Sequence, residues 1–205
     1  MLDTKINTII FDFGGVLLGL DKPACLKAFK DLGCDEIEYY LDKCRQQGFF
    51  LDFEEGKISN EEFFAQLKKL IGNKATQKEI EHAYLQFLTD LPAYKLDLIL
   101  KLHQKYKIIL LSNINQFVFE YCRKKYFEQN GHSIDDFFDK VYLSYQLGIC
   151  KPDEQIYRLM IADSNLVPEQ CFYLDDGMAN VEMGKKMGFQ CYCPKINEDF
   201  RFLFE

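Results

Sequence analysis

The hydrophobic positions of this 205-residue chain follow different spacings in different parts of the sequence. Near the N-terminus, an apolar run at residues 6–11 stops at Asp12 and is followed by Gly14 and Gly15. An uninterrupted apolar run of this length predicts a buried β-strand, and the glycines predict a turn after it. We therefore expect the chain to open with a strand whose end carries a carboxylate.

From about residue 22 to residue 106, apolar residues recur at helical spacing. Two helix starts are marked by capping boxes, one from Ser59 to Glu62 and one from Thr76 to Glu79. Glycines and Pro92 divide this stretch, which predicts several short helices.

After residue 106, apolar runs alternate with amphipathic segments. The runs predict strands at 107–111, 140–143, 171–174 and 190–193, and the segments predict helices at 115–129, 153–163 and 178–187. This alternation is typical of an α/β fold, a Rossmann-like, doubly wound parallel sheet with helices on both faces.

The helical stretch interrupts this pattern directly after the first strand. So many consecutive helices cannot all flank one sheet edge, and an insertion of this size normally covers the site as a lid or cap. We therefore expect residues 1–19 and 96–205 to form the core domain and residues 20–95 an all-helical cap.

Three of the predicted strands end in polar residues. The first ends at Asp12, the second at Ser112 and Asn113, and the fourth at Asp175 and Asp176. Because parallel strands point the same way, these ends meet at the carboxyl edge, where open α/β sheets bind ligands. A single polar residue there is commonly a helix cap, but three coinciding strand ends predict a site.

Carboxylates gathered at one edge repel one another unless a cation joins them. An all-oxygen cluster of Asp12, Asp175 and Asp176 suits Mg²⁺. The Gly14 carbonyl is a further candidate ligand, and Gly15 lets a ligand approach the main chain closely.

Phosphate-binding groups are present in the same pattern. Ser112, Asn113 and the amides around Gly15 are candidate donors to an oxyanion, and Lys151 is a candidate fixed positive charge. Taken alone, Lys151 is more typical of a solvated loop. Together with a carboxylate and a metal, these groups predict a phosphate site that contains a nucleophile.

In order and spacing, four motifs between residue 8 and about residue 193 resemble those of the haloacid dehalogenase (HAD) superfamily. They are Asp12-x-Gly14-Gly15-Val16, Leu111-Ser112-Asn113, Lys151-Pro152, and Leu174-Asp175-Asp176 with Asn180. The helical insertion, with its segment at 54–64, resembles that family's cap. Within the superfamily, the sequence resembles most the small sugar-phosphate phosphatases, including glucose-1-phosphate phosphatases.

The resemblance implies a Mg²⁺-dependent phosphatase that forms an aspartyl-phosphate on Asp12. It implies that Ser112 binds the phosphoryl group and that Lys151 balances its charge. The implied metal ligands are Asp12, the Gly14 carbonyl, Asp176, and Asp175 either directly or as an outer partner.

One position departs from the family pattern. Most phosphatases of the superfamily carry a second aspartate, a general acid and base, where this chain has Gly14. Such a group contributes about 10²–10⁴-fold in rate. Either the leaving oxygen needs little protonation, as in an anomeric phosphate, or Asp21 substitutes, although Asp21 before Pro23 is more typical of a helix N-cap.

Two other functions stay open. A metal-independent 2-haloacid dehalogenase also lacks the second aspartate, although that branch generally lacks an acid pair such as Asp175 and Asp176. A regulatory protein that binds Mg²⁺ and phosphate but turns over poorly is the other alternative.

Substrate choice is expected to depend on the cap. Candidates for contact with the leaving group are Arg45, Gln46, Gln47 and the aromatic residues Phe49, Phe50 and Phe53. For the phenylalanines, an aromatic core between cap helices is an equally good interpretation.

The composition of the chain limits the classes of partner that we expect it to bind. The net charge of −7 disfavours nucleic acid, which is bound through clustered Lys and Arg. No apolar stretch reaches the length of a membrane span, and the eight cysteines lack the spacing of a zinc site. We expect a cytoplasmic enzyme, monomeric or homodimeric, that acts on a small phosphorylated metabolite without nucleic-acid or membrane partners.

Overall fold

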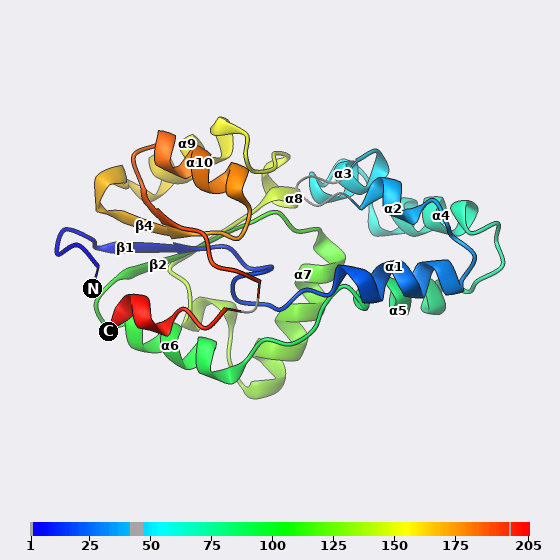
Figure 1. Ribbon diagram of the computed structural model, residues 1–205, viewed down its shortest axis with the longest axis horizontal. Helices are drawn as coiled ribbons and strands as arrows, with labels where there is room; N and C mark the ends of the chain where they lie inside the picture. The colour runs from blue at the N-terminus through cyan, green and yellow to red at the C-terminus, as the bar shows by residue number, and fades with distance from the viewer. Residues whose placement is uncertain (1, 42–46, 197) are drawn as a thin grey trace.

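The computed structural model describes residues 2–41, 47–196 and 198–205, and its centre is a parallel sheet. Its five strands lie in the order β3-β2-β1-β4-β5 (Figure 1). They span β1 Thr8–Phe11, β2 Lys107–Ser112, β3 Lys140–Leu143, β4 Cys171–Leu174 and β5 Gln190–Tyr192. The predicted parallel α/β fold is confirmed.

The register of the sheet aligns the strand ends that carry polar residues. Phe11, the last residue of β1, lies opposite Leu110 of β2 and Leu174 of β4. The chain runs outward from β1 to β2 and β3 on one side, and to β5 beyond β4 on the other. The order therefore reverses beside β1, and such switch points bind ligands in open α/β sheets.

Helices cover both faces of the sheet. Helices α9 (Glu154–Ser164) and α10 (Met178–Lys186) lie on one face, and α6 (Ala93–His103) and α7 (Gln116–Cys122) lie on the other (Figure 1). The short helix α8 (Ser144–Leu147) follows β3. Alternate residues of β1 point to opposite faces: Ile10 packs in one hydrophobic cluster, and Ile9 and Phe11 pack in another.

The predicted helix at 115–129 is not α-helical throughout. Asn115 caps α7, and its side chain accepts a hydrogen bond from the Val118 amide at 3.0 Å. After Cys122 the chain continues as a π-helix over Arg123–Phe127 and then as a 3₁₀ turn. Helical residues therefore lie where the sequence predicted them, but a wider π-helical turn and then a tighter 3₁₀ turn replace the end of the α-helix.

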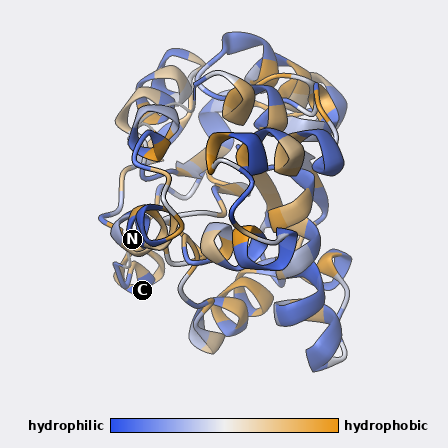
Figure 2. Cartoon of the chain, turned by 90° about the vertical axis from the view of Figure 1, so that its right-hand side faces the viewer, coloured by the Kyte–Doolittle hydropathy of each residue, from blue (hydrophilic) through white to orange (hydrophobic). Residues whose placement is uncertain are grey.

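The described residues of the predicted cap region contain five helices. They are α1 (Lys22–Asp31), α2 (Ile37–Tyr40), α3 (Phe49–Glu54), α4 (Asn60–Leu70) and α5 (Gln77–Leu85). Both capping boxes form, since Ser59 and Glu62, and likewise Thr76 and Glu79, bond reciprocally. Hydrophobic and hydrophilic residues alternate along these helices, as one-sided burial requires (Figure 2).

The cap has its own aromatic interior. Phe50, Phe53 and Phe63 are buried, and the rings of Phe53 and Phe63 stack with centroids 4.0 Å apart. Phe49 packs against Phe50 at 4.8 Å. These phenylalanines are therefore cap core, the second of the two interpretations. Gln47 is exposed, and the candidates Arg45 and Gln46 lie outside the described residues.

Two linkers join the cap to the core and pair with each other. The Gly19 amide donates to the Asp90 carbonyl at 2.8 Å, and the Asp21 amide donates to the Phe87 carbonyl at 2.8 Å. Helix α6 begins at Ala93 and packs against β2. The domain boundaries at 19/20 and 95/96 stay a prediction.

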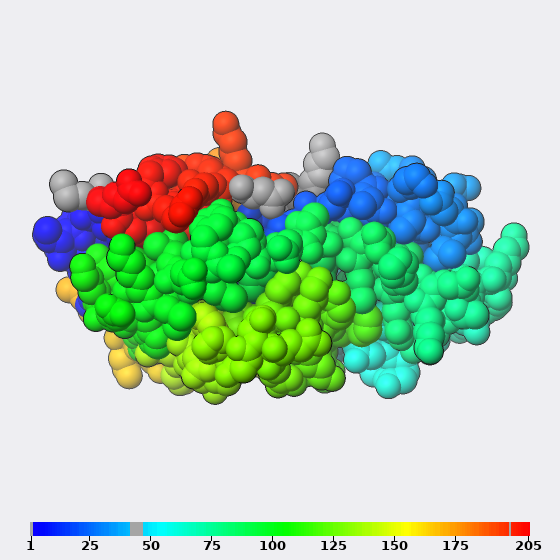
Figure 3. Space-filling model, turned by 90° about the horizontal axis from the view of Figure 1, so that it is seen from below, coloured from blue at the N-terminus to red at the C-terminus, as the bar shows by residue number. Residues whose placement is uncertain are grey.

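The cap also contacts the core away from these linkers. The Ser144 hydroxyl of α8 lies 2.7 Å from the carbonyl oxygen of Glu54, at the end of α3. The same hydroxyl accepts a hydrogen bond from the Ile114 amide at 2.9 Å. The cap lies at one end of an elongated molecule (Figure 3), and both chain termini lie at the other.

No helix in the described part of the chain is long and apolar enough to cross a membrane. Cys25, Cys34, Cys122, Cys171, Cys191 and Cys193 are free thiols.

Candidate active site

The end of β1 places Asp12 at the centre of the carboxyl edge. Its side chain is buried, and Oδ1 accepts a hydrogen bond from the Phe13 amide at 2.7 Å. The same oxygen lies 2.9 Å from Nζ of Lys151. Asp12 is therefore held through one oxygen, and no described residue forms a hydrogen bond to its other oxygen, Oδ2.

Lys151 is enclosed by acceptors. Its ammonium group is buried and lies 2.6 Å from Oδ2 of Asp175, besides its contact with Asp12. It also donates to the Leu111 carbonyl at 2.8 Å. Burial alone would lower the pKa of Lys151, but the carboxylates of Asp12 and Asp175 outweigh it and raise the pKa above its usual value. Lys151 is therefore a permanent positive charge within the site.

Asn113 holds the backbone of Lys151. Its Oδ1 accepts from the Lys151 amide at 2.7 Å, and its Nδ2 donates to the Lys151 carbonyl at 2.8 Å. The structure therefore gives Asn113 a positioning contact, and its predicted phosphate contact stays a prediction.

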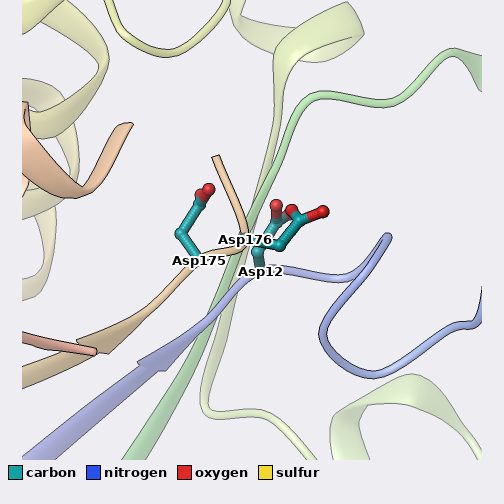
Figure 4. Close-up of side chains that lie close together, drawn as sticks. All are labelled: Asp12, Asp175 and Asp176. Carbon is teal, nitrogen blue, oxygen red and sulfur yellow. The ribbon is translucent and has the colours of Figure 1, made fainter. Parts of the chain in front are cut away.

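Asp175 and Asp176 follow β4 but lie in different surroundings. Asp175 is fully buried, with Oδ2 bonded by Lys151 and the Tyr173 hydroxyl. Its Oδ1 accepts from the Gly177 amide at 2.8 Å and from Asn180 at 2.9 Å. Asp176 is partly exposed, and its carboxylate lies beside that of Asp12, whereas the carboxylate of Asp175 stands to one side of these two (Figure 4).

The charges of this cluster fit a divalent cation. One oxygen from each of Asp12, Asp175 and Asp176 lies within 4.8 Å of the others, and Lys151 offsets only one charge. Burial, followed by repulsion from Asp175 and Asp176, raises the pKa of Asp12 well above its usual value, against the pull of Lys151. Such a cluster favours Mg²⁺, which prefers oxygen ligands.

Gly15 allows this cluster to form. Its φ is +78°, and a Cβ added there would come within 2.2 Å of Oδ2 of Asp176. Any side chain at this position would displace the carboxylate. The close neighbour of Gly15 in the structure is thus the Asp176 carboxylate, and the predicted approach of a ligand at Gly15 stays a prediction.

A pocket between core and cap opens beside these groups. Ser112, Asn113 and Gly14 line it from the core. Ser112 is buried at the end of β2. Asp21 does not line the pocket. Its Oδ1 accepts from the Ala24 amide at 2.9 Å, so the structure gives it the helix-capping role.

Three polar pocket residues were not singled out as site candidates from the sequence. Glu54 ends α3, Tyr84 lies in α5, and Asn115 precedes α7. Asn115 had a usable signal, because an asparagine before an amphipathic run predicts an N-cap. The two cap residues carry no local signal for a place beside Ser112.

The chain combines a doubly wound sheet with a candidate aspartate nucleophile at the switch point of the sheet. A buried lysine and two further aspartates lie beside this aspartate, and a helical insertion follows the first strand. These features together define the class of HAD-like hydrolases. The model of the haloacid dehalogenase-like hydrolase family matches residues 6–188. The chain therefore belongs to this family, and the expected resemblance is confirmed.

Individual relatives are similar over nearly the whole chain. A D-ribitol-5-phosphate phosphatase of Bacteroides thetaiotaomicron is 41% identical over 196 residues, covering 96% of this chain and 95% of its own length. A HAD family enzyme of the same organism, crystallised as an Asp12→Ala mutant with magnesium and inorganic phosphate, superposes with a TM-score of 0.93. It is 35% identical, with coverage of 98% and 99%.

A third relative extends the similarity to another organism. A predicted HAD-like family hydrolase from Porphyromonas gingivalis is 40% identical, with a TM-score of 0.88. The alignment covers 98% of this chain and 100% of that structure.

The acid cluster predicts pH-dependent binding of Mg²⁺. Burial, followed by repulsion from Asp175, raises the pKa of Asp176 from 3.8 to about 6. Protons then compete with the ion below pH 6, so the affinity for Mg²⁺ should rise about tenfold between pH 5 and pH 7. Calorimetric titration at these pH values measures it, and equal affinities would contradict the prediction.

The raised pKa of Asp176 also determines whether the stability of the metal-free protein rises or falls with pH. Because the folded pKa is the higher one, the folded protein binds more protons than the unfolded chain between about pH 4 and pH 6. The contribution of Asp176 to stability is therefore present below about pH 4 and is lost as the pH rises through 6. Urea unfolding in EDTA tests this sign.

Proposed function

We propose that this protein is a Mg²⁺-dependent phosphatase that hydrolyses a small phosphomonoester through an aspartyl-phosphate on Asp12. The observation that carries the proposal is the position of Asp12, fixed by Lys151 beside Asp176 at a pocket that Ser112 lines. A nucleophilic carboxylate, a fixed cation and an oxygen cluster for a metal are the groups that phosphoryl transfer requires.

In the first step, Oδ2 of Asp12 attacks phosphorus and the bond to the ester oxygen breaks. The leaving oxygen departs with the electron pair of that bond and takes up a proton from solvent water, because Gly14 stands where the superfamily's general acid is usually found. Oδ1 stays bonded to Lys151 and to the Phe13 amide, which keeps the carboxylate aligned. Ser112 donates its hydroxyl hydrogen to a phosphoryl oxygen, and Lys151 offsets the negative charge.

In the second step, water attacks the aspartyl-phosphate, which releases inorganic phosphate and restores Asp12. Asp12, Asp176 and the Gly14 carbonyl would hold the metal, with Asp175 as an outer partner because its oxygens are already bonded. When bound, Mg²⁺ supplies positive charge that draws the phosphoryl group toward the carboxylates.

The substrate class is a small phosphorylated sugar or polyol. A relative 41% identical over 96% of this chain is a D-ribitol-5-phosphate phosphatase, so D-ribitol 5-phosphate is the first candidate. The small pocket favours a small leaving group. Action in the cytoplasm, a monomeric or homodimeric state, and a cap at residues 20–95 are parts of the same proposal.

The proposal is tested by phosphate release from a panel of sugar and polyol phosphates. We expect turnover with Mg²⁺ and a loss of at least about a hundredfold in EDTA, since a metal contributes several kcal/mol to such a transition state. Metal-independent halide release from 2-haloacids would instead show a dehalogenase. Docking of BeF₃⁻ on Asp12 without hydrolysis of any ester would show a regulatory binding protein.

A further inference from the structure

The wall of the pocket beside Asp12 is mainly apolar, with contributions from both core and cap. Its walls include Leu18, Leu20, Leu88 and Val118. Among the described residues that line it, only Glu54 and Tyr84 are titratable, and both come from cap helices. A leaving group extending from the phosphoryl site would therefore meet mainly hydrocarbon, with polar side chains at Glu54 and Tyr84 on the cap and at Ser112, Asn113 and Asn115 on the core.

The Tyr84 ring is fixed between the two parts of the molecule. It packs against Phe63 of the cap, with centroids 5.3 Å apart, and against Phe117 of α7 at 6.3 Å. Its side chain is buried, with 8% of the residue exposed. Burial, with the negative charge of Glu54 as a smaller cause, raises the pKa of Tyr84 well above its usual value. The hydroxyl therefore keeps its hydrogen.

Asn115 determines the direction of that hydrogen. Its Oδ1 accepts from the Val118 amide at 3.0 Å, so its Nδ2 is the group that faces Tyr84. Nδ2 donates to the Tyr84 hydroxyl oxygen at 2.8 Å. The oxygen acts as acceptor in this contact, and within the described chain no acceptor is bonded to the hydroxyl hydrogen. A buried donor is thus left available at a pocket wall.

We propose that Tyr84 is a specificity-determining residue that donates its hydroxyl hydrogen to a hydroxyl group of the leaving alcohol, with Glu54 as an acceptor on the same wall. The substrate is then a phosphomonoester of a polyhydroxylated alcohol, in preference to a hydrocarbon alcohol of equal length. This inference rests on the proposed phosphatase function and assigns the discrimination to named side chains.

The discrimination follows from burial. A hydrocarbon leaving group would cover the Tyr84 hydroxyl without giving it an acceptor, and a site built to bond a hydroxyl rejects analogues that lack it. A polyol satisfies the donor and also offers hydrogens to Glu54.

The test compares two esters that differ only in their hydroxyl groups, D-ribitol 5-phosphate and n-pentyl phosphate. The readout is the ratio of their kcat/KM values. Wild-type protein should favour the ribitol ester, and Tyr84→Phe should lower the ratio about fivefold to tenfold, the effect of one neutral hydrogen bond. Tyr142→Phe is the matched control, because its hydroxyl bonds Asp163 and Ser164 outside this pocket.

A second variant changes the direction of the Tyr84 hydroxyl hydrogen while the Tyr84 side chain itself is kept. In Asn115→Asp, the carboxylate still accepts from Val118 but also accepts the Tyr84 hydrogen, which turns it away from the substrate. The ratio should fall as in Tyr84→Phe, and the added charge should cancel between two esters of equal charge.

The outcomes separate the two proposals. Turnover of both esters with a ratio unmoved by Tyr84→Phe would overturn the role of Tyr84 alone. Failure of the wild type to release phosphate from any ester would overturn the phosphatase function and this inference together. The melting temperature of each variant is also measured, to show that the kcat/KM ratios are compared between folded proteins.

Discussion

Replacing Asp12 by Asn is expected to lower kcat for phosphate release at least about a thousandfold, because the amide cannot form the phosphoryl-enzyme bond. The side chain keeps its shape, and Oδ1 can still accept from the Phe13 amide. Phosphate release at saturating substrate and Mg²⁺ measures the effect. Retention of more than a tenth of the wild-type rate would contradict the central role of Asp12.

Asp21→Asn is the matched control. Asn caps a helix about as well as Asp, so the bond to the Ala24 amide persists and activity should stay near that of the wild type. A loss of about a hundredfold would instead show that Asp21 moves into the site and acts as the missing general acid. The two variants thus distinguish the nucleophilic role of Asp12 from the alternative in which Asp21 supplies the general acid that is missing at Gly14.

Lys151→Met is expected to destabilise the protein by about 3–5 kcal/mol at pH 7, because it leaves the buried carboxylates of Asp12 and Asp175 without their cation. Activity should also fall, since the phosphoryl group loses its fixed positive charge. Urea unfolding in EDTA measures the stability. Burial raises the pKa of Asp12 well above its usual value, so relative to the wild type the loss should shrink at pH 5, where protonation of Asp12 removes part of the unpaired charge.

Lys140→Met provides the comparison at the surface. Lys140 forms an ion pair with Asp163 at 3.1 Å and is 47% exposed, and such pairs contribute about 0–1 kcal/mol. If Lys151→Met cost no more than Lys140→Met, the buried charge network would not stabilise the fold as described.

The sequence predicted the features that depend on neighbouring residues. An apolar run ending in Asp12 or in Asp175 is a local pattern, and a parallel sheet brings such ends together whatever the connections between them. The reciprocal bonds at Ser59 and Thr76 are local as well, because each capping box spans one helical turn. These signals were sufficient for the fold class and for the residues at the sheet edge.

Contacts between distant segments could not be predicted in this way. The bond from Asn115 to Tyr84 depends on how the cap meets the core, and nothing near either residue indicates the other. The pairing of Asn113 with the Lys151 backbone likewise joins two loops that only the folded sheet brings together. Phe50 and Phe53 show the same limit, since a buried aromatic residue and a ligand-facing one look alike in sequence.

The pairing of the two linkers also affects how this architecture can vary. Because residues 19–21 lie against residues 87–90, the cap enters and leaves the core at one place, as a closed loop with joined ends. The entropy of closing a loop grows only slowly with its length. Helices can therefore be lengthened, shortened or exchanged inside the cap while the strand ends keep their geometry, so substrate range can diverge without altering the reaction chemistry.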